Sequence, residues 1–524
     1  MRKSQLKVSA IFLTVIMSLT LLSGCGLKSN AEVKVNSNNN GQTKPQILTF
    51  GAAADLKASA EGETLVFDTF TVFAEKMKMA PSLAESWEIK NDGKTYVLHL
   101  RKGVKFHNAQ DFTADVAKFS LEYWGKYESV DYLKNLDNIK VVDANTLEVN
   151  FKGPYTALIS ELKNIKATLK ESVDDKGNIV EYIGTGPFKL TEYLKDQKAV
   201  LARNTDYWNK SRLPKIEQVV WQAIPDENAR LMAIKSGQVD AIGVSEHYIS
   251  LPYEAIPGLE KTEGLSVLKQ TKEGSIATYC FNYKEGVMSD LNLRKAVAYA
   301  IDRETMVKKV LNGVPEASGH FLHPEFTDGP SKEKPYFYDS QLAKEALAAA
   351  GFKDTNGDGI VEKDGKPVKL RLLTKSTKTD TDVAVFVQNN LKQVGIDVEI
   401  KALDSNQFSQ ETLKGNFDIA RTHPWIAPAI YYLVWRGNSD QYDKYGIGLK
   451  ADAQFDALKN TALTSFDEKI RSAAWEKIWE LEYSVYPATP LYVQPRVFVY
   501  KSNIKGFKFD PDVVVIDLSQ VTVE

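Results

Sequence analysis

The chain has 524 residues, which at about 100–200 residues per domain predicts two to four domains. With 43% hydrophobic and 26% charged residues, it has the composition of a globular protein and not of a disordered one. The net charge of −2 gives no indication of a nucleic-acid partner, and two cysteines exclude a disulfide framework and a multi-cysteine zinc site.

The first segment, residues 1–24, has the pattern of a secretory signal peptide. Basic residues begin it, and residues 8–22 then form an uncharged, mostly apolar run that is shorter than the about 20 residues needed to span a bilayer. The following Leu-Ser-Gly-Cys of 22–25 resembles a bacterial lipobox, which implies cleavage before Cys25 and a lipid on its thiol. The alternative is a plain signal peptide with an incidental cysteine.

Residues 25–45 are predicted to form a lipidated, flexible tether. They contain the polar, low-complexity run Asn-Ser-Asn-Asn-Asn-Gly at 36–41. A lipid on Cys25 would hold the protein on the extracytoplasmic face of the bacterial cell membrane. A disordered tail without a mechanical purpose is the alternative interpretation of this stretch.

From residue 47 onward, short predicted strands alternate with helices. Apolar and polar residues alternate at 95–101 and 147–151, which predicts strands. Helical spacing predicts a helix at 290–301 that begins at Asp290, and later helices end at glycines. The other predicted elements are helices at 302–311, 341–350 and 382–394 and strands at 276–283, 368–373 and 396–400. Units of helix, glycine and strand are typical of α/β layers.

Residues 354–359 imitate the start of a calcium-binding loop. Their sequence is Asp-Thr-Asn-Gly-Asp-Gly, but the twelfth position, which needs a bidentate glutamate, is Gly365. We interpret the segment as a hairpin with Asn-Gly and Asp-Gly turns.

The glycines of 184–188 lack the dinucleotide-binding spacing. Cys280 lies in a predicted strand, where we expect a small buried side chain.

Several segments in a shared order resemble one family, the extracytoplasmic solute-binding proteins of peptide- and nickel-type ABC importers, solute-binding family 5. Residues 79–87 (Met-Ala-Pro-Ser-Leu-Ala-Glu-Ser-Trp) and 91–96 (Asn-Asp-Gly-Lys-Thr-Tyr) are similar to one of its motifs. Residues 184–188 (Gly-Thr-Gly-Pro-Phe) and 204–208 (Asn-Thr-Asp-Tyr-Trp) match two more. The other matching segments are 100–107, 112–115, 237–240, 281–282, 293–302 and 350–367. The resemblance covers nearly the whole predicted mature chain.

The resemblance implies a two-lobed, periplasmic-binding-protein-like α/β fold with an extra small domain and a ligand cleft between the lobes. The first lobe is expected at 46–66, 183–278 and 488–524, the small domain at 67–182 and the second lobe at 279–487. Two crossings between the lobes would form a hinge. The implied function is the capture of a small ligand for the permease and ATPase subunits of an ABC importer, without a cofactor or enzymatic turnover.

The identity of the ligand stays open at this point. The resemblance places residues 417–432 in the cleft, where many members carry an acidic residue before a proline. Here Ala427 precedes Pro428, so the carboxylate that meets the amino terminus of the peptide in peptide binders is missing. Ala429 stands where nickel-type members often carry a histidine. A short peptide and a nickel or other metal–chelate complex are both compatible with this pattern.

Five candidate ligand contacts follow from the resemblance. Lys166 occupies the place of an arginine that holds a chelator's carboxylate, and it keeps the charge without the bidentate fork. Tyr132 falls where nickel-type relatives place an aromatic wall, with packing inside the small domain as the alternative. Arg421 offers a cation, Trp425 an apolar wall and His423 a metal or chelate contact, although His423 could also be a hydrogen-bonded core residue.

A surface-tethered secreted hydrolase is the alternative function. It would need a nucleophile–base pair or paired catalytic carboxylates, and no linear signature provides one. An adhesive surface protein would show repeats, and the sequence contains none of fixed period.

Overall fold

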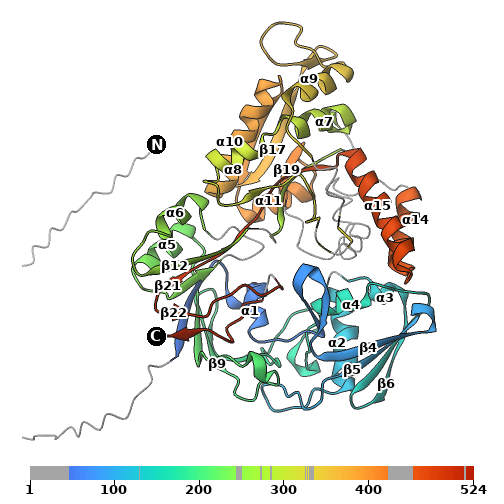
Figure 1. Ribbon diagram of the computed structural model, residues 1–524, viewed down its shortest axis with the longest axis vertical. Coiled ribbons are helices and arrows are strands. Elements are labelled where there is room, and N and C mark those ends of the chain that lie inside the picture. Colours follow the sequence, from blue (N-terminus) through green and yellow to red (C-terminus); the bar gives the residue numbers. More distant parts are fainter. Residues whose placement is uncertain are drawn as a thin grey trace, which may run out of the picture. The chain divides into compact units, whose positions relative to one another are not determined.

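Three large β-sheets, each with its own helices, make up the described part of the chain (Figure 1). The structure is a computed structural model, and residues 45–524 form one compact unit. Among the described residues, no helix is long and apolar enough to cross a membrane. The described residues are 46–524 except for 129, 244–250, 272–273, 284–285, 325, 327, 330–335, 423–452 and 513–514.

A seven-stranded mixed sheet forms the first lobe. Its strands are β1 (Ile47–Ala52), β8 (Phe188–Leu194), β9 (Lys198–Arg203), β10 (Gln218–Ala223), β11 (Ala241–Gly243), β12 (Leu265–Gln270) and β21 (Arg496–Lys501). They lie in the order β12-β21-β11-β1-β10-β9-β8, and β1 runs parallel to both of its neighbours. The helices of this lobe are α1 (Ala60–Thr64), α5 (Glu227–Lys235) and α6 (Ile256–Leu259). The sheet therefore joins segments from both ends of the described chain.

The small domain is built on a four-stranded antiparallel sheet in the order β4-β5-β7-β6. Its elements are β4 (Ala84–Lys90), β5 (Thr95–Leu100), α2 (Ala114–Tyr127), α3 (Tyr132–Asn135), β6 (Leu136–Asp143), β7 (Thr146–Phe151) and α4 (Leu158–Glu161). β5 and β7 confirm the two strands predicted from alternating residues. The apolar face of α2 packs with this sheet in one hydrophobic core, to which Leu121 and Trp124 contribute.

The second lobe has a six-stranded sheet in the order β14-β20-β13-β19-β17-β18. Its strands are β13 (Ile276–Phe281), β14 (Glu316–Ala317), β17 (Lys369–Lys375), β18 (Asp397–Leu403), β19 (Ile419–Thr422) and β20 (Ala488–Val493). All residues of β13 are buried, because this strand is central and covered on both faces. Cys280 is one of them, and its thiol donates to the carbonyl of Ala420, so the prediction of a buried cysteine is confirmed.

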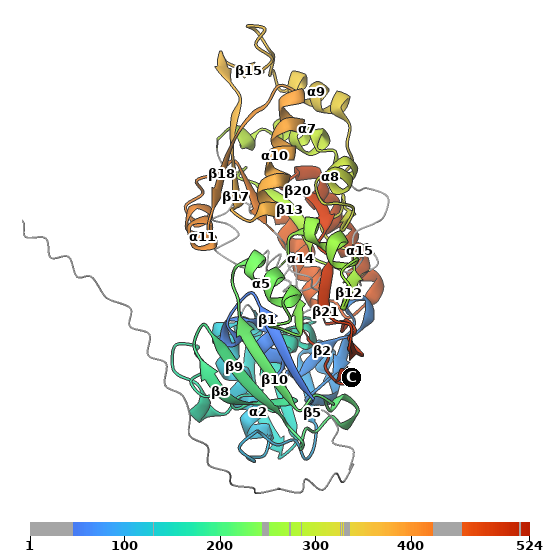
Figure 2. The same ribbon diagram turned by 90° about the vertical axis from the view of Figure 1, so that its left-hand side faces the viewer.

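Helices cover the second sheet, and α10 lies along β17 and β18 (Figure 2). The described helices of this lobe are α7 (Leu291–Ala300), α8 (Arg303–Lys309), α9 (Ser340–Ala349), α10 (Lys378–Gln393), α11 (Ser405–Leu413), α14 (Ala453–Thr464) and α15 (Glu468–Val485). The short strands outside the three sheets are β2 (Thr71–Phe73), β3 (Met79–Pro81), β15 (Glu362–Lys363), β16 (Lys366–Pro367), β22 (Ile504–Lys505) and β23 (Thr522–Val523).

Side-chain caps begin the helices of the second lobe, as the sequence predicts. Asp290, Asp302 and Asp339 each accept a hydrogen bond from an amide of the first turn of α7, α8 and α9. α10 begins about one turn earlier than predicted, because the hydroxyl of Thr377 already caps it there. Gly395 then adopts a φ of +91° between α10 and β18, the left-handed conformation that glycine tolerates best.

Two adjacent segments connect the lobes, from β12 to β13 and from β20 back to β21. Their backbones meet where the amide of Gln494 donates to the carbonyl of Ser275 at 2.7 Å. A Cβ at Gly274 would lie 1.8 Å from the carbonyl oxygen of Gln494, so only glycine allows this approach. β20 pairs with β13 and lies in the second lobe, whereas residues 488–493 were assigned to the first lobe from the sequence. The sequence pattern does not show which strand is the partner of β20.

Candidate ligand-binding site

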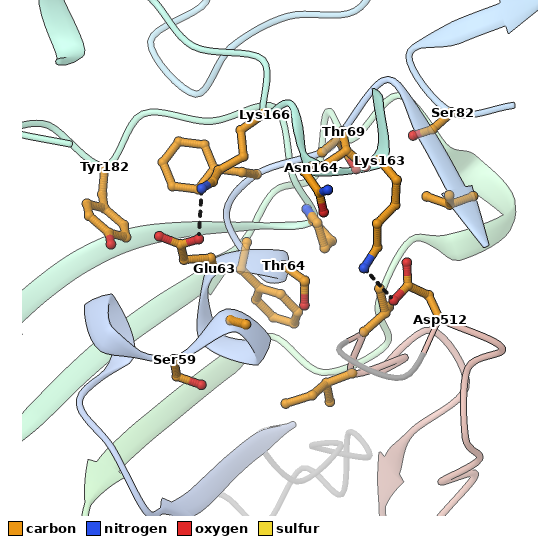
Figure 3. A pocket seen from close by; sticks show the side chains of 18 of the residues that line it. Ser59, Glu63, Thr64, Thr69, Ser82, Lys163, Asn164, Lys166, Tyr182 and Asp512 are labelled. Carbon is orange, nitrogen blue, oxygen red and sulfur yellow. Dashed lines mark ion pairs between the residues drawn. The ribbon is translucent and has the colours of Figure 1, made fainter. Parts of the chain in front are cut away.

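A cavity of about 860 Å³ lies between the first lobe and the small domain (Figure 3). Its described walls come from segments within 57–82, 124–128, 163–182, 187–214 and 512–519. Pockets of about 300–1,000 Å³ suit small-molecule ligands. Both signs of charge occur on the walls. The charged lining residues are Lys57, Glu63, Asp68, Glu128, Lys163, Lys166, Arg212, Asp512 and Asp517.

Lys166 lies on the cavity wall, held by two carboxylates and an indole ring. Its Nζ is 3.2 Å from Glu63 Oε2 and 2.9 Å from Glu128 Oε1, and it lies 4.3 Å from the ring centroid of Trp124. Burial opposes the charged form, but the two carboxylates outweigh it and raise the pKa of Lys166. With both carboxylates ionised, this group carries one more negative charge than positive. The two glutamates gave no signal in the sequence, because they lie far from Lys166 along the chain.

Two more cations on the wall are also paired with acids. Lys163 Nζ lies 3.3 Å from Asp512 Oδ1, which ties the small domain to the C-terminal segment (Figure 3). Arg212 Nη2 lies 2.7 Å from Asp510 Oδ2 and 3.9 Å from Asp517 Oδ2. Asp510, Asp512 and Asp517 are buried. These ion pairs fix the rim of the cavity and leave little uncompensated charge there.

Asp68 connects two of the segments that the sequence analysis singled out. Its carboxylate accepts hydrogen bonds from Thr185 Oγ1 at 2.8 Å, Tyr207 Oη at 2.9 Å and Trp208 Nε1 at 2.8 Å. Burial raises the pKa of Asp68, and the three donors oppose that shift. Thr185 belongs to the segment 184–188, and the two aromatic residues belong to 204–208. The motifs therefore position the cavity wall, a role that the sequence alone did not assign to them.

Tyr132 lies in the core of the small domain. Its side chain has no exposed surface, and its hydroxyl donates to the carbonyl of Leu121 at 2.5 Å. It is not among the described residues that line the cavity. This placement corresponds to the alternative of packing within the small domain.

Arg421 is buried in the second lobe and does not reach the described wall of this cavity. Its Nε donates to Asp380 Oδ1 at 3.1 Å, in the first turn of α10. Strand pairing places Tyr279 opposite Arg421, and the buried hydroxyls of Tyr279 and Thr379 have no hydrogen-bond partner within the described part of the chain. The structure therefore does not bring Arg421 and Lys166 together on one wall, and Asp380 neutralises the charge that was expected to meet a ligand.

The remaining predicted functional residues, His423, Trp425 and Cys25, lie outside the described residues. So do the predicted signal peptide and tether. Their roles stay predictions.

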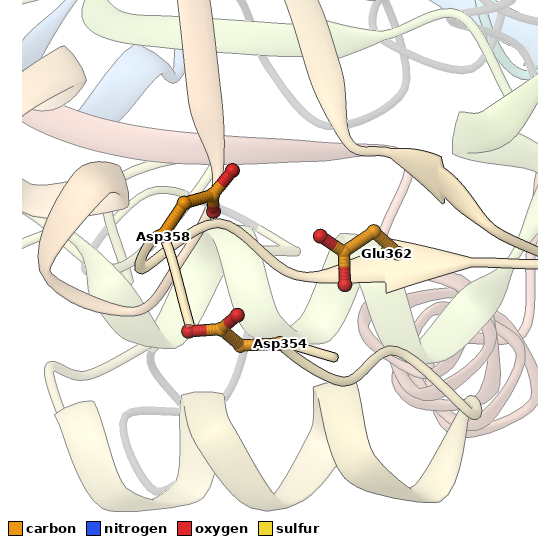
Figure 4. Close-up of side chains that lie close together, drawn as sticks. All are labelled: Asp354, Asp358 and Glu362. Carbon is orange, nitrogen blue, oxygen red and sulfur yellow. The ribbon is translucent and has the colours of Figure 1, made fainter. Parts of the chain in front are cut away.

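Three carboxylates converge at the loop that imitates a calcium site (Figure 4). An oxygen from each of Asp354, Asp358 and Glu362 lies within 4.8 Å of the others. The loop itself supplies donors to them, since the amides of Gly357 and Gly359 donate to Asp354. β15 and β16 then form a hairpin directly after this loop. The segment bends at 355–359 between the bridged residues Lys353 and Glu362, so the expected turns are present, but the tight hairpin lies at 362–367 and not at the Asn-Gly and Asp-Gly positions.

Two mixed α/β lobes joined by a double crossing, with a charged cavity beside them, define the class of bilobal binding proteins. The comparisons agree with this class. The model of the family "Bacterial extracellular solute-binding proteins, family 5 Middle" matches residues 78–442. The oligopeptide-binding protein AppA of Bacillus subtilis is 28% identical, covering 96% of this chain and 97% of the relative.

Similar proteins bind different ligands. The nickel-binding periplasmic protein of Escherichia coli is 25% identical over 88% of this chain and 89% of the relative. The crystal structure of NikA from Brucella suis in complex with Fe(III)-EDTA has a TM-score of 0.82 and 26% identity, and covers 91% of this chain and all of that one.

The chain belongs to the bacterial extracellular solute-binding proteins of family 5. The two-lobed fold predicted from the sequence is confirmed by its structural neighbours. Proteins of this family bind solutes outside the cytoplasm and do not transform them, so the prediction of an extracytoplasmic protein without enzymatic activity is confirmed by membership. The secreted hydrolase is not supported.

Proposed function

We propose that this protein is the receptor subunit of an ABC importer that captures short peptides and delivers them to its permease and ATPase subunits. The observation that carries this proposal is the cavity of about 860 Å³ with both signs of charge on its walls. A peptide carries an ammonium and a carboxylate, so it gains from a wall that offers both signs at separate places. The similarity to AppA over almost the whole chain supports the same ligand class.

The group around Lys166 suits the positive end of such a ligand. Two carboxylates, Glu63 and Glu128, share one lysine, so the group retains a net negative charge. The aromatic ring of Trp124 at the same place adds a favourable surface for an ammonium. In this proposal Lys166 holds the two glutamates in position and contacts the ligand through them. Arg421 and Tyr132 do not line the described wall, and Trp425 lies outside the described residues, so these three contacts stay predictions.

A metal–chelate complex is the second candidate ligand. It is favoured by the similarity to NikA in complex with Fe(III)-EDTA, whose TM-score is 0.82. His423 is the predicted metal contact for this case. Its segment lies outside the described residues, so the choice between the two ligand classes depends on direct chemical analysis.

Native purification followed by mass spectrometry and metal analysis of the same sample tests the proposal. We expect co-purified peptides and less than one equivalent of any transition metal. Binding of the identified peptides should raise the melting temperature with concentration, because a ligand that binds only the folded state stabilises it by mass action. Stoichiometric nickel or iron together with a small chelator, and no peptide, would show that a metal–chelate complex is the ligand instead of a peptide.

We further propose that Cys25 anchors the receptor to the membrane through a lipid. The lipobox-like residues 22–25 after an apolar run support this role. Metabolic labelling with a fatty acid, followed by membrane fractionation, should show a labelled wild type and an unlabelled Cys25→Ala variant. Equal labelling of both proteins would refute the lipid anchor at Cys25 without contradicting the proposed receptor function.

A further inference from the structure

Lys57 differs from the other cations on the cavity wall. Lys163, Lys166 and Arg212 each form at least one ion pair with a carboxylate. Within the described part of the chain, no carboxylate forms an ion pair with Lys57, although Lys57 lines the same cavity. Its positive charge is therefore the least compensated one on the described wall.

Two aromatic rings hold the ammonium of Lys57. Its Nζ lies 4.4 Å from the ring centroid of Tyr182 and 4.2 Å from that of Tyr193. Ring faces attract a cation but do not neutralise its charge. Lys57 is the middle residue of a short 3₁₀ turn, Leu56–Ala58, whose N-cap Asp55 accepts from the amide of Lys57.

Asp55 is the acid nearest to Lys57 in sequence, and donors other than the Lys57 ammonium hold its carboxylate. Oδ1 accepts from the amide of Lys57 at 2.9 Å and from Tyr193 Oη at 2.9 Å, and Oδ2 accepts from the amide of Asp196 at 2.8 Å. Burial lowers the pKa of Lys57, and the Asp55 charge opposes that shift without cancelling it. The ammonium thus keeps donors for a partner that comes from the cavity.

We infer that Lys57 is the anion anchor of the cavity and binds a carboxylate of the ligand, with Tyr182 and Tyr193 holding its ammonium in place. This inference rests on the proposed receptor function and deepens it. Lys57 and the group of Glu63, Glu128 and Lys166 then place both signs of charge on the cavity wall. Figure 3 shows the Tyr182 side chain near Glu63, and the Lys57 ammonium lies over the ring of the same tyrosine.

Both candidate ligand classes carry the required carboxylate. A peptide supplies it at its C-terminus, and a chelator such as histidine supplies it beside the metal. The carboxylate is the shared chemistry, and neutral amides of the same molecules separate its contribution from the rest of the ligand. The assignment therefore does not depend on which of the two classes is correct.

Calorimetry with matched acids and amides tests the role of Lys57. The probes are the peptide most abundant in the native preparation and its C-terminal amide, and nickel with histidine or with histidinamide. The proteins are the wild type, Lys57→Gln, Lys57→Arg and the control Lys295→Gln. Lys295 Nζ lies 5.8 Å from the ring centroid of Tyr486 in the second lobe, and Lys295 does not line the cavity. It therefore repeats the lysine–tyrosine contact of Lys57 at a position where no ligand is expected.

The wild type and Lys295→Gln should bind the acid about ten- to a hundredfold more tightly than the amide, which corresponds to one charge-assisted hydrogen bond. Lys57→Gln should bind both forms alike, and Lys57→Arg should retain much of the preference. An unchanged preference in Lys57→Gln, or no preference in the wild type, would overturn the assignment and leave the receptor function standing. Failure of every probe to bind the wild type would overturn both.

Discussion

Replacing Glu161 by glutamine should remove a pH-dependent loss of stability from the small domain. Glu161 ends α4 and is fully buried. Its Oε1 accepts from the amide of Asp131 at 2.7 Å, but its Oε2 has no hydrogen-bond partner within the described residues. Burial is the main cause that raises the pKa of Glu161 to about 8. The folded protein therefore keeps this carboxyl protonated at neutral pH.

The sign of the effect follows from proton linkage. Below about pH 4.5 the carboxyl is protonated in the folded and the unfolded chain alike. Between that pH and about 8 only the unfolded chain releases the proton, so the free energy of unfolding decreases as the pH rises. Each pH unit in this window lowers it by about 1.4 kcal/mol, and the whole window amounts to about 5 kcal/mol. Glutamine keeps the acceptor for Asp131 and cannot ionise.

Calorimetric melting of the wild type and Glu161→Gln at about pH 5 to 8 measures this difference. The two proteins should melt alike at the acidic end, and the variant should melt several degrees higher at the alkaline end. Glu122→Gln is the control, because Glu122 lies on α2 of the same domain with about half of its side chain exposed, and it should follow the wild type throughout. Parallel curves for the wild type and Glu161→Gln, or a variant that is less stable at pH 8, would refute the reasoning.

Three further expectations follow. Lys166→Ala should lower both the melting temperature of the ligand-free protein and the ligand affinity, because it leaves Glu63 and Glu128 without their cation. The loss in free energy of unfolding should be about 1–3 kcal/mol. Lys166→Arg should restore much of both properties. Thr156 donates through Oγ1 to the carbonyl of Leu463 at 2.8 Å, joining the small domain to the second lobe. Thr156→Val should therefore weaken ligand binding about two- to tenfold in calorimetry and enlarge the radius of gyration in solution scattering; an unchanged affinity would show that this contact does not control closure. His423→Ala should bind peptide as the wild type does, and loss of co-purified metal from this variant alone would instead indicate a chelate ligand.

Local features of this protein were predictable from neighbouring residues. Aspartates at 290, 302 and 339 cap helices through amides of the next turn, which is a contact within a few residues of the chain. Alternating residues also predicted β5 and β7. β7 is buried at every second residue, as a half-covered strand should be, whereas β5 is buried along nearly its whole length. The α/β class and the family likewise follow from short segments in a fixed order.

The candidate site could be predicted only in part. The resemblance predicted Lys166 as a ligand contact, and the structure places it on the wall of a cavity between the first lobe and the small domain, but its two carboxylate partners were not foreseen. Arg421 likewise has a partner that the sequence did not indicate. It was expected to offer a cation to the ligand, but Asp380 neutralises its charge inside the second lobe. A charge in a sequence shows what a side chain can do, and its environment determines whether that charge is available.

The sequence by itself determined several helices and strands, three helix caps and the family, because those depend on interactions over a few residues or on motifs kept in order. The tertiary structure decided which distant segments meet. It paired β20 with β13, placed Asp68 between two motifs and brought Lys57 next to Tyr182 and Tyr193. Ion pairing, burial and exposure to a cavity depend on these long-range contacts, and so the polarity of the binding site appears only once the chain is folded.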